Sequence, residues 1–234
     1  MTAFDATGPA CALCGAACRA AFQPPPAETA PDLDLRPGEP TRSTLRKWLV
    51  TCRGCGATAP DLVRLPAAAR AVVAGEAYRA LKGPVAGFLR WAMIAEAVDG
   101  PAEAAQAMLE AAWMEDDAGR DATTLRRRAA SLWKEPATMQ DALRLVDVLR
   151  RGGALEGAGS RVAALLARPD LDETDAAVLR YQQGLITAGD TARHLLSSAL
   201  RPPAQRPHVT HGQSSGKAPG KAPTRGFWQR LAGG

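Results

Sequence analysis

Four of the five cysteines lie in two matching motifs, each with two residues between its cysteines and a glycine directly after them. Two intervening residues let both sulfurs of one turn face a single ion, and the glycine lets the backbone fold back toward the sulfurs. Two such turns supply four thiolates, which is the ligand set of a closed tetrahedral site. The pattern predicts a metal centre whose ligands are Cys11, Cys14, Cys52 and Cys55.

Zinc is the metal that this pattern favours, in a structural role. Four thiolates leave no coordination position for water, so we expect no Lewis-acid chemistry. A rubredoxin-like iron site uses the same ligands and stays open as an alternative. A pair of redox-active C-x-x-C motifs is disfavoured, because paired motifs in a reducing compartment indicate metal rather than disulfides.

Cys18 is the odd cysteine. We expect it to be a small packed residue next to the site. The alternatives are a substitute ligand or a reactive thiol beside the cluster.

No convincing catalytic set accompanies the cysteines. His208 and His211 have a chelating H-x-x-H spacing, but they lie in a low-complexity stretch. The acidic run Glu115–Asp117 cannot converge on one point from a single helical turn, so we expect a solvated helix end. We therefore predict a non-catalytic protein, with an enzyme using Cys18 or the acidic run as a remote alternative.

The segments that must position the cysteines are short. Residues 46–51 are predicted to form a strand that leads into the second cysteine pair, and the Pro-rich stretch 23–40 is predicted to be a loop. The chain has no run of about 20 apolar residues and no visible signal peptide at its start, so we expect no transmembrane helix and a cytoplasmic location.

From about residue 66 to residue 200 the apolar spacing becomes helical, and 49 alanines favour closely packed helices. Helix starts are indicated at Pro101, Thr138 and Asp172. Turns are indicated at Gly119, Gly153 and Gly189, whose spacings of 34 and 36 residues approach the tetratricopeptide (TPR) period. We expect six or seven helices in a degenerate TPR-like array, with an irregular helical bundle as the alternative.

The predicted fold is therefore mostly α. Residues 1–66 form a small N-terminal β zinc ribbon with the Pro-rich loop 23–40, residues 67–200 form the helical TPR-like domain, and residues 201–234 form a flexible basic tail. The tail holds six basic residues and no acidic one, whereas the first 200 residues carry 23 basic and 24 acidic groups. This near-neutral body disfavours duplex binding and makes the tail the part expected to sense an acidic partner.

The tail ends in a short amphipathic motif. Apolar anchors at Phe227, Trp228 and Leu231 fall on one side of a helical turn, with Arg230 beside them. So short a helix orders only against another surface. We expect it to bind a partner protein, and the alternatives are an unstructured end, docking on the protein's own body, and weak contact with a membrane.

One part of the chain resembles a known group. The segment 41–62 has a tryptophan four residues before the second cysteine pair, and tryptophan-containing stretches follow at 88–92 and 111–119. Over residues 8–135 the chain is similar to an uncharacterised bacterial family described as domain of unknown function 2225. The resemblance implies a zinc knuckle followed by TPR-like helices and implies no activity.

The function we predict is a zinc-binding adaptor that acts through contacts with an unidentified protein partner. The alternative is a nucleic-acid-associated zinc ribbon, because basic residues cluster around the second cysteine pair. These residues are Arg42, Arg46, Lys47 and Arg53.

Overall fold

The computed structural model describes residues 8–200, and within that range most residues in regular structure are helical. The elements are η1 (Arg42–Lys47), β1 (Val50–Thr51), β2 (Thr58–Ala59), α1 (Ala69–Ala74), α2 (Glu76–Ala80), α3 (Ala86–Val98), α4 (Pro101–Asp117), α5 (Thr123–Leu132), α6 (Met139–Arg151), α7 (Leu155–Leu166), α8 (Glu173–Thr187) and α9 (Leu196–Ala199). The prediction of a mostly helical chain with a small N-terminal sheet is confirmed.

Six helices of ten or more residues, α3 to α8, form a stack in which each packs on the next in chain order. Caps and turns at the ends of these helices lie at residues that the sequence analysis indicated. The Thr138 and Asp172 side chains cap α6 and α8 by accepting hydrogen bonds from the third following amide, at 3.1 and 2.8 Å. Gly119, Gly153 and Gly189 have φ between 65° and 73°, as helix-ending glycines require.

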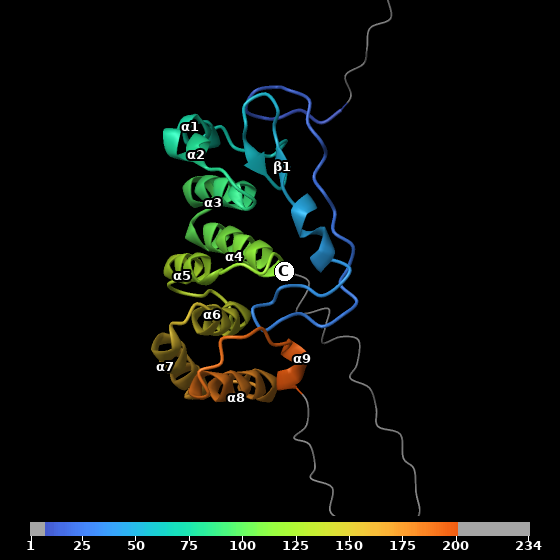
Figure 1. The fold of residues 1–234 in the computed structure, drawn as a ribbon. Coiled ribbons are helices and arrows are strands. Elements are labelled where there is room, and N and C mark those ends of the chain that lie inside the picture. Colours follow the sequence, from blue (N-terminus) through green and yellow to red (C-terminus); the bar gives the residue numbers. More distant parts are fainter. Residues whose placement is uncertain (1–7, 201–234) are drawn as a thin grey trace, which may run out of the picture.

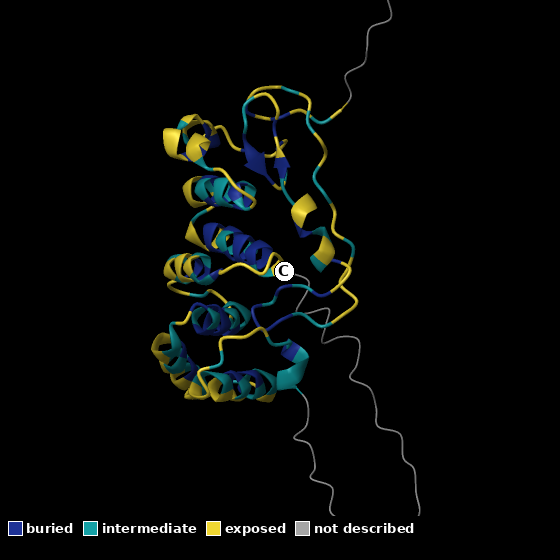
Figure 2. Cartoon of the chain, viewed as in Figure 1, coloured by how far each residue is buried: buried dark blue, intermediate teal, exposed yellow. Residues whose placement is uncertain are grey.

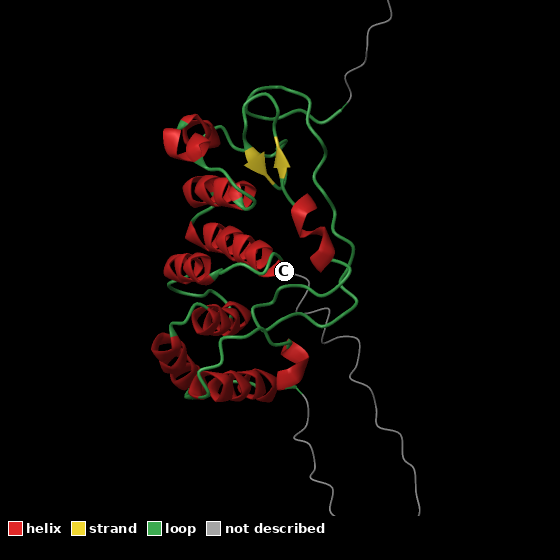
Figure 3. Cartoon of the chain, viewed as in Figure 1, coloured by secondary structure: helices red, strands yellow, loops and turns green. Residues whose placement is uncertain are grey.

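The two strands, yellow in Figure 3, form a short antiparallel ladder in which Val50 lies opposite Ala59 and Thr51 opposite Thr58. The predicted strand over 46–51 is wrong at its start, because Arg46 and Lys47 belong to the 3-10 helix η1. That helix brings Leu45 into the core between α3 and α4, and this long-range burial outweighs the local strand preference.

The N-terminal segment runs the length of the helical stack (Figure 1). From the cysteine region it descends to the far end, where Asp32 forms an isolated bridge with Leu195, and it returns through η1 to the sheet. The stretch 23–40 holds no helix or strand, as expected of a loop. It is not a solvated excursion, however, since Leu33 is 1% exposed in the core of α6, α7 and α8.

Buried residues are densest in α4 and α6, in the middle of the stack (Figure 2). Alanine lines much of α4, so neighbouring helices approach closely without large side chains. Within residues 8–200, no helix combines the length and apolar content that a bilayer crossing requires.

Candidate metal centre

The structure brings the four predicted cysteines together from the two ends of residues 11–55. All four sulfurs lie within 4.8 Å of one another. The Cys11–Cys55 sulfur separation is 3.8 Å and the Cys14–Cys52 separation is 3.5 Å. A tetrahedron with Zn–S bonds of about 2.3 Å has edges of about 3.8 Å. The sulfurs therefore fit a single tetrahedral ion.

The two cysteine turns have the same backbone geometry. In the first, the Gly15 amide donates to the Cys11 carbonyl at 2.8 Å, and in the second the Gly56 amide donates to Cys52 at 2.9 Å. Both glycines have positive φ, 73° and 78°, which a residue with a Cβ adopts only with strain. The sequence prediction that glycine closes each turn is met at both places.

The ionisation of Cys52 and Cys55 favours a cation between the sulfurs. Burial opposes ionisation of Cys52, but hydrogen bonds from the amides of Cys55 and Gly54 outweigh it and lower the pKa of this thiol to about 7. Burial and the neighbouring cysteines raise the pKa of Cys55 to about 12. The Cys52 thiolate thus forms easily, and its negative charge opposes ionisation of Cys55. A divalent cation between the sulfurs removes this repulsion.

Gly54 is a site residue that the sequence analysis missed. A Cβ at this position would lie 2.9 Å from the Ala16 Cβ and 3.1 Å from the Cys14 sulfur. Only glycine lets the second turn approach the first so closely. The glycine between Cys52 and Cys55 is visible in the sequence, but the reason for it is the close contact between the two turns in the fold.

Helices α1 and α2 brace the site from behind. The buried Tyr78 hydroxyl accepts a hydrogen bond from the Thr58 amide at 2.9 Å and donates to the Gly56 carbonyl at 3.1 Å. Arg70 donates to the Leu13 carbonyl in the first turn at 2.9 Å. Each helix therefore fixes one cysteine turn.

Cys18 lies outside the four-sulfur group and packs, half-buried, against an apolar cluster that includes Cys11, Leu13 and Cys52. Burial, followed by the charges of Cys52 and Asp61, raises the pKa of its thiol. This placement matches the expected packed bystander.

The acidic run at the end of α4 is solvent-exposed at Asp117, whose side chain is 46% exposed, but Glu115 is buried and Asp116 half-buried, so the expectation of a solvated helix end was wrong for these two. Each carboxylate has a different arginine partner. Asp116 accepts from Arg126 and Arg151, with shortest distances of 2.6 and 2.9 Å. Glu115 pairs with Arg120, and Asp117 with Arg36. The carboxylates of the run therefore form ion pairs that connect α4 to α5, α6 and the N-terminal segment.

Asp34, in the loop, is the centre of this network. It is fully buried and accepts hydrogen bonds from the indole N–H of Trp113 at 2.9 Å and from Arg151 at 3.1 Å. A nitrogen of Arg126 lies 3.6 Å away. Burial opposes ionisation of this carboxyl, but Arg151 and Arg126 outweigh it and hold its pKa below the usual range.

Basic residues around the second cysteine pair divide into two groups. Arg42 is engaged, because its guanidinium pairs with the buried Asp32. Arg46, Lys47 and Arg53 are exposed. Three of the four residues of the predicted cluster are therefore accessible to solvent.

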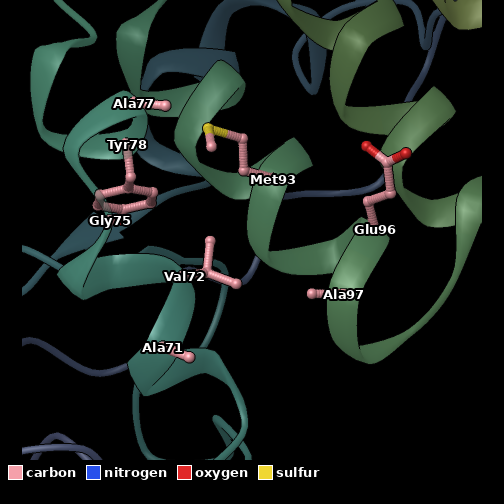
Figure 4. A pocket seen from close by; sticks show the side chains of 8 residues that line it. All are labelled: Ala71, Val72, Gly75, Ala77, Tyr78, Met93, Glu96 and Ala97. Atoms are coloured by element: carbon pink, nitrogen blue, oxygen red, sulfur yellow. The ribbon is translucent and has the colours of Figure 1, made fainter.

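An apolar hollow of about 390 Å³ lies between α1, α2 and α3, next to Tyr78 (Figure 4). Its lining is Ala71, Val72, Gly75, Ala77, Tyr78, Met93, Glu96 and Ala97. The carboxylate of Glu96 stands at one side and pairs with Arg128 at 3.7 Å. The hollow offers shape and apolar contact rather than groups that transfer protons.

The tail anchors Phe227, Trp228, Arg230 and Leu231 lie outside the described residues.

Compared with protein-family models, with curated proteins and with solved structures, the chain gives no match.

Proposed function

We propose that this protein is a non-catalytic zinc protein in which a zinc ribbon holds the N-terminal segment against a TPR-like helical stack. The observation that carries the proposal is the group of four sulfurs, closed by two glycine turns. Zinc bound there supplies folding free energy, because unfolded cysteines form no preassembled site. Four thiolates leave no position for a reacting water, which supports a structural role.

We further propose that the helical stack is the working surface of a cytoplasmic adaptor. The apolar hollow beside Met93 provides a surface for a short apolar segment of a partner protein. The metal centre supports that hollow, because Tyr78 both lines it and holds the second cysteine turn. Loss of metal is then expected to disturb partner binding.

The metal assignment is tested on the full chain by measuring bound zinc and iron. We expect one zinc per chain, lost together with the cooperative unfolding transition of the N-terminal segment in Cys14→Ser and Cys52→Ser. Cys18→Ser is the matched control and keeps the metal, because its sulfur lies outside the group. Zinc retained by the Cys14→Ser, Cys52→Ser double variant would refute the assignment.

The adaptor role is tested by quantitative affinity capture from the native cell. The baits are the full chain, a chain ending at Leu200, and Met93→Glu, which places a charge in the hollow. We expect a protein that co-elutes with the full chain to be lost with Met93→Glu. An eluate identical for all three baits contradicts the proposal.

A further inference from the structure

Charge is distributed unevenly along the folded chain. Residues 41–90, which run from η1 through the second cysteine turn to the start of α3, hold nine basic and two acidic side chains. The first 40 residues hold two basic and five acidic groups, and residues 91–200 hold 12 basic and 17 acidic groups. The first 200 residues are nearly neutral overall, but residues 41–90, here called the metal end, carry a formal net charge of +7.

These basic side chains are largely uncompensated. Within residues 8–200, Arg42 is the one basic residue of the 41–90 segment that has an ion pair, with Asp32. By contrast, arginines of the stack such as Arg126, Arg150 and Arg151 are buried against aspartates. Five residues of the segment are exposed, and their side chains make no ion pair or hydrogen bond with the described part of the chain: Arg46, Arg53, Arg64, Arg79 and Lys82.

Four exposed basic residues lie close in sequence to the cysteine turns and are here named the cationic patch: Arg19, Arg46, Lys47 and Arg53. Arg19 donates to the Lys47 carbonyl at 3.5 Å, which joins the chain after the first turn to η1. The Lys47 ammonium lies 5.8 Å from the centre of the Phe22 ring. Arg53 lies within the second turn itself. All four side chains are exposed.

The metal centre does not account for this charge. A divalent ion on four thiolates carries a net charge of about −2, which offsets two of the basic groups. The Cys14 side is exposed and would itself be visible to solvent. Most of the positive field at this end remains after zinc binding, and such a field favours an anionic ligand.

We propose that the cationic patch binds single-stranded nucleic acid. Phosphates would lie against Arg46, Lys47 and Arg53, and the partly exposed Phe22 ring, whose centre is 5.8 Å from the Lys47 ammonium, would stack with a base. An anionic membrane fits less well, because Val63 is the one large apolar side chain that is strongly exposed among residues 8–200. This inference goes beyond the proposed adaptor role and rests on a different observation.

The test is fluorescence anisotropy of the zinc-loaded full chain with a labelled oligouridine or oligothymidine of about 20 nucleotides. We expect binding that weakens as salt rises, and a loss of about tenfold or more at about 50 mM salt in the Arg46→Glu, Arg53→Glu variant. The slope of log affinity against log salt should fall by about 0.7 for each phosphate contact removed.

The control is Lys134→Glu, Arg180→Glu, which makes the same change in net charge on exposed residues of α8 and the loop before α6. Because the basic tail is present in both variants, its contribution cancels. We expect the control to bind within about threefold of the wild type, since its lost charges are screened at the patch. Equal losses in both variants would assign binding to overall charge or to the tail and overturn the proposal.

Two further outcomes are decisive. Failure of the full chain to bind either strand overturns the proposal, and so does sedimentation with phosphatidylserine vesicles that the strand does not compete away. Bound zinc is measured in each variant, and Arg46→Glu, Lys47→Glu repeats the test if Arg53→Glu loses metal. Zinc retained without nucleic-acid binding leaves the metal assignment intact and removes this inference alone.

Discussion

Asp34→Ala is expected to be among the most destabilising single substitutions outside the metal centre. The carboxylate is fully buried and lies between Arg151, at 3.1 Å, and Arg126, at 3.6 Å, whose side chains are 8% and 3% exposed. Removing it leaves two buried guanidiniums with a shared partner missing, and it leaves the Trp113 indole N–H without its acceptor.

The size of the effect follows from this environment. Deleting one partner of a buried, hydrogen-bonded ion pair costs about 3–5 kcal/mol, because the remaining charge stays desolvated. Asp116 still faces both arginines, which keeps the expected loss of unfolding free energy near the lower end, about 3 kcal/mol. Asp34→Asn keeps the shape and one acceptor oxygen, so we expect a smaller loss.

The assay is urea unfolding of the zinc-loaded chain, followed by far-UV circular dichroism, with hydrogen exchange to locate the change. Asp170→Ala is the matched control, since its pair with Arg168 is exposed on both sides and should contribute less than about 1 kcal/mol. Because the pKa of Asp34 is lowered in the fold, its contribution is present above the ordinary aspartate range and is lost as pH falls. Asp34→Asn should therefore flatten the acid limb of the stability curve.

A loss below about 1 kcal/mol for Asp34→Ala, or a loss equal to that of Asp170→Ala, would refute the reasoning. It would mean that the loop 32–36 is not held by charge against α4, α5 and α6. Faster hydrogen exchange in α4 and α6 without a change in the loop would contradict it as well.

Three further predictions address the metal end and the stack. Gly54→Ala should cost about 1–3 kcal/mol and weaken zinc retention against a chelator, because its Cβ meets Ala16 and Cys14, whereas Gly157→Ala, whose Cβ meets nothing within 4 Å, should do neither. Tyr78→Phe should lower the unfolding free energy by about 1–3 kcal/mol, since the buried Thr58 amide loses its acceptor; thermal unfolding of zinc-loaded protein measures this, and an unchanged midpoint would count against the bracing role. Burial raises the pKa of Glu110 to about 7, so the folded state holds a proton that the unfolded state releases, and stability should fall as pH rises from about 4.5 to about 7. Glu110→Gln should reduce that fall in urea midpoints measured at both ends of the range, and an identical fall in both proteins would contradict the assignment.

Local signals carried much of the fold. Helix caps and turns depend on residues three or four positions apart, so the sequence predicts them directly. Examples are the caps at Thr138 and Asp172 and the turn at Gly153. The four cysteines were also predictable as a group, because metal geometry fixes the spacing within each turn and the number of ligands. The predicted strand was wrong at residues 46–47, because contacts with residues far away in the sequence decide the structure there. Burial of Leu45 against the helices favours a 3-10 helix at this point.

The sequence by itself determined the metal-ligand set, the helical character of the stack and the positions of its turns, since each follows from short-range chemistry. Only the tertiary structure decided that Asp34 is a buried partner of two arginines and that Gly54 is the contact point of the cysteine turns. A side chain's electrostatic role depends on the neighbours that folding brings within a few ångströms, and those neighbours lie up to 161 positions away along the chain.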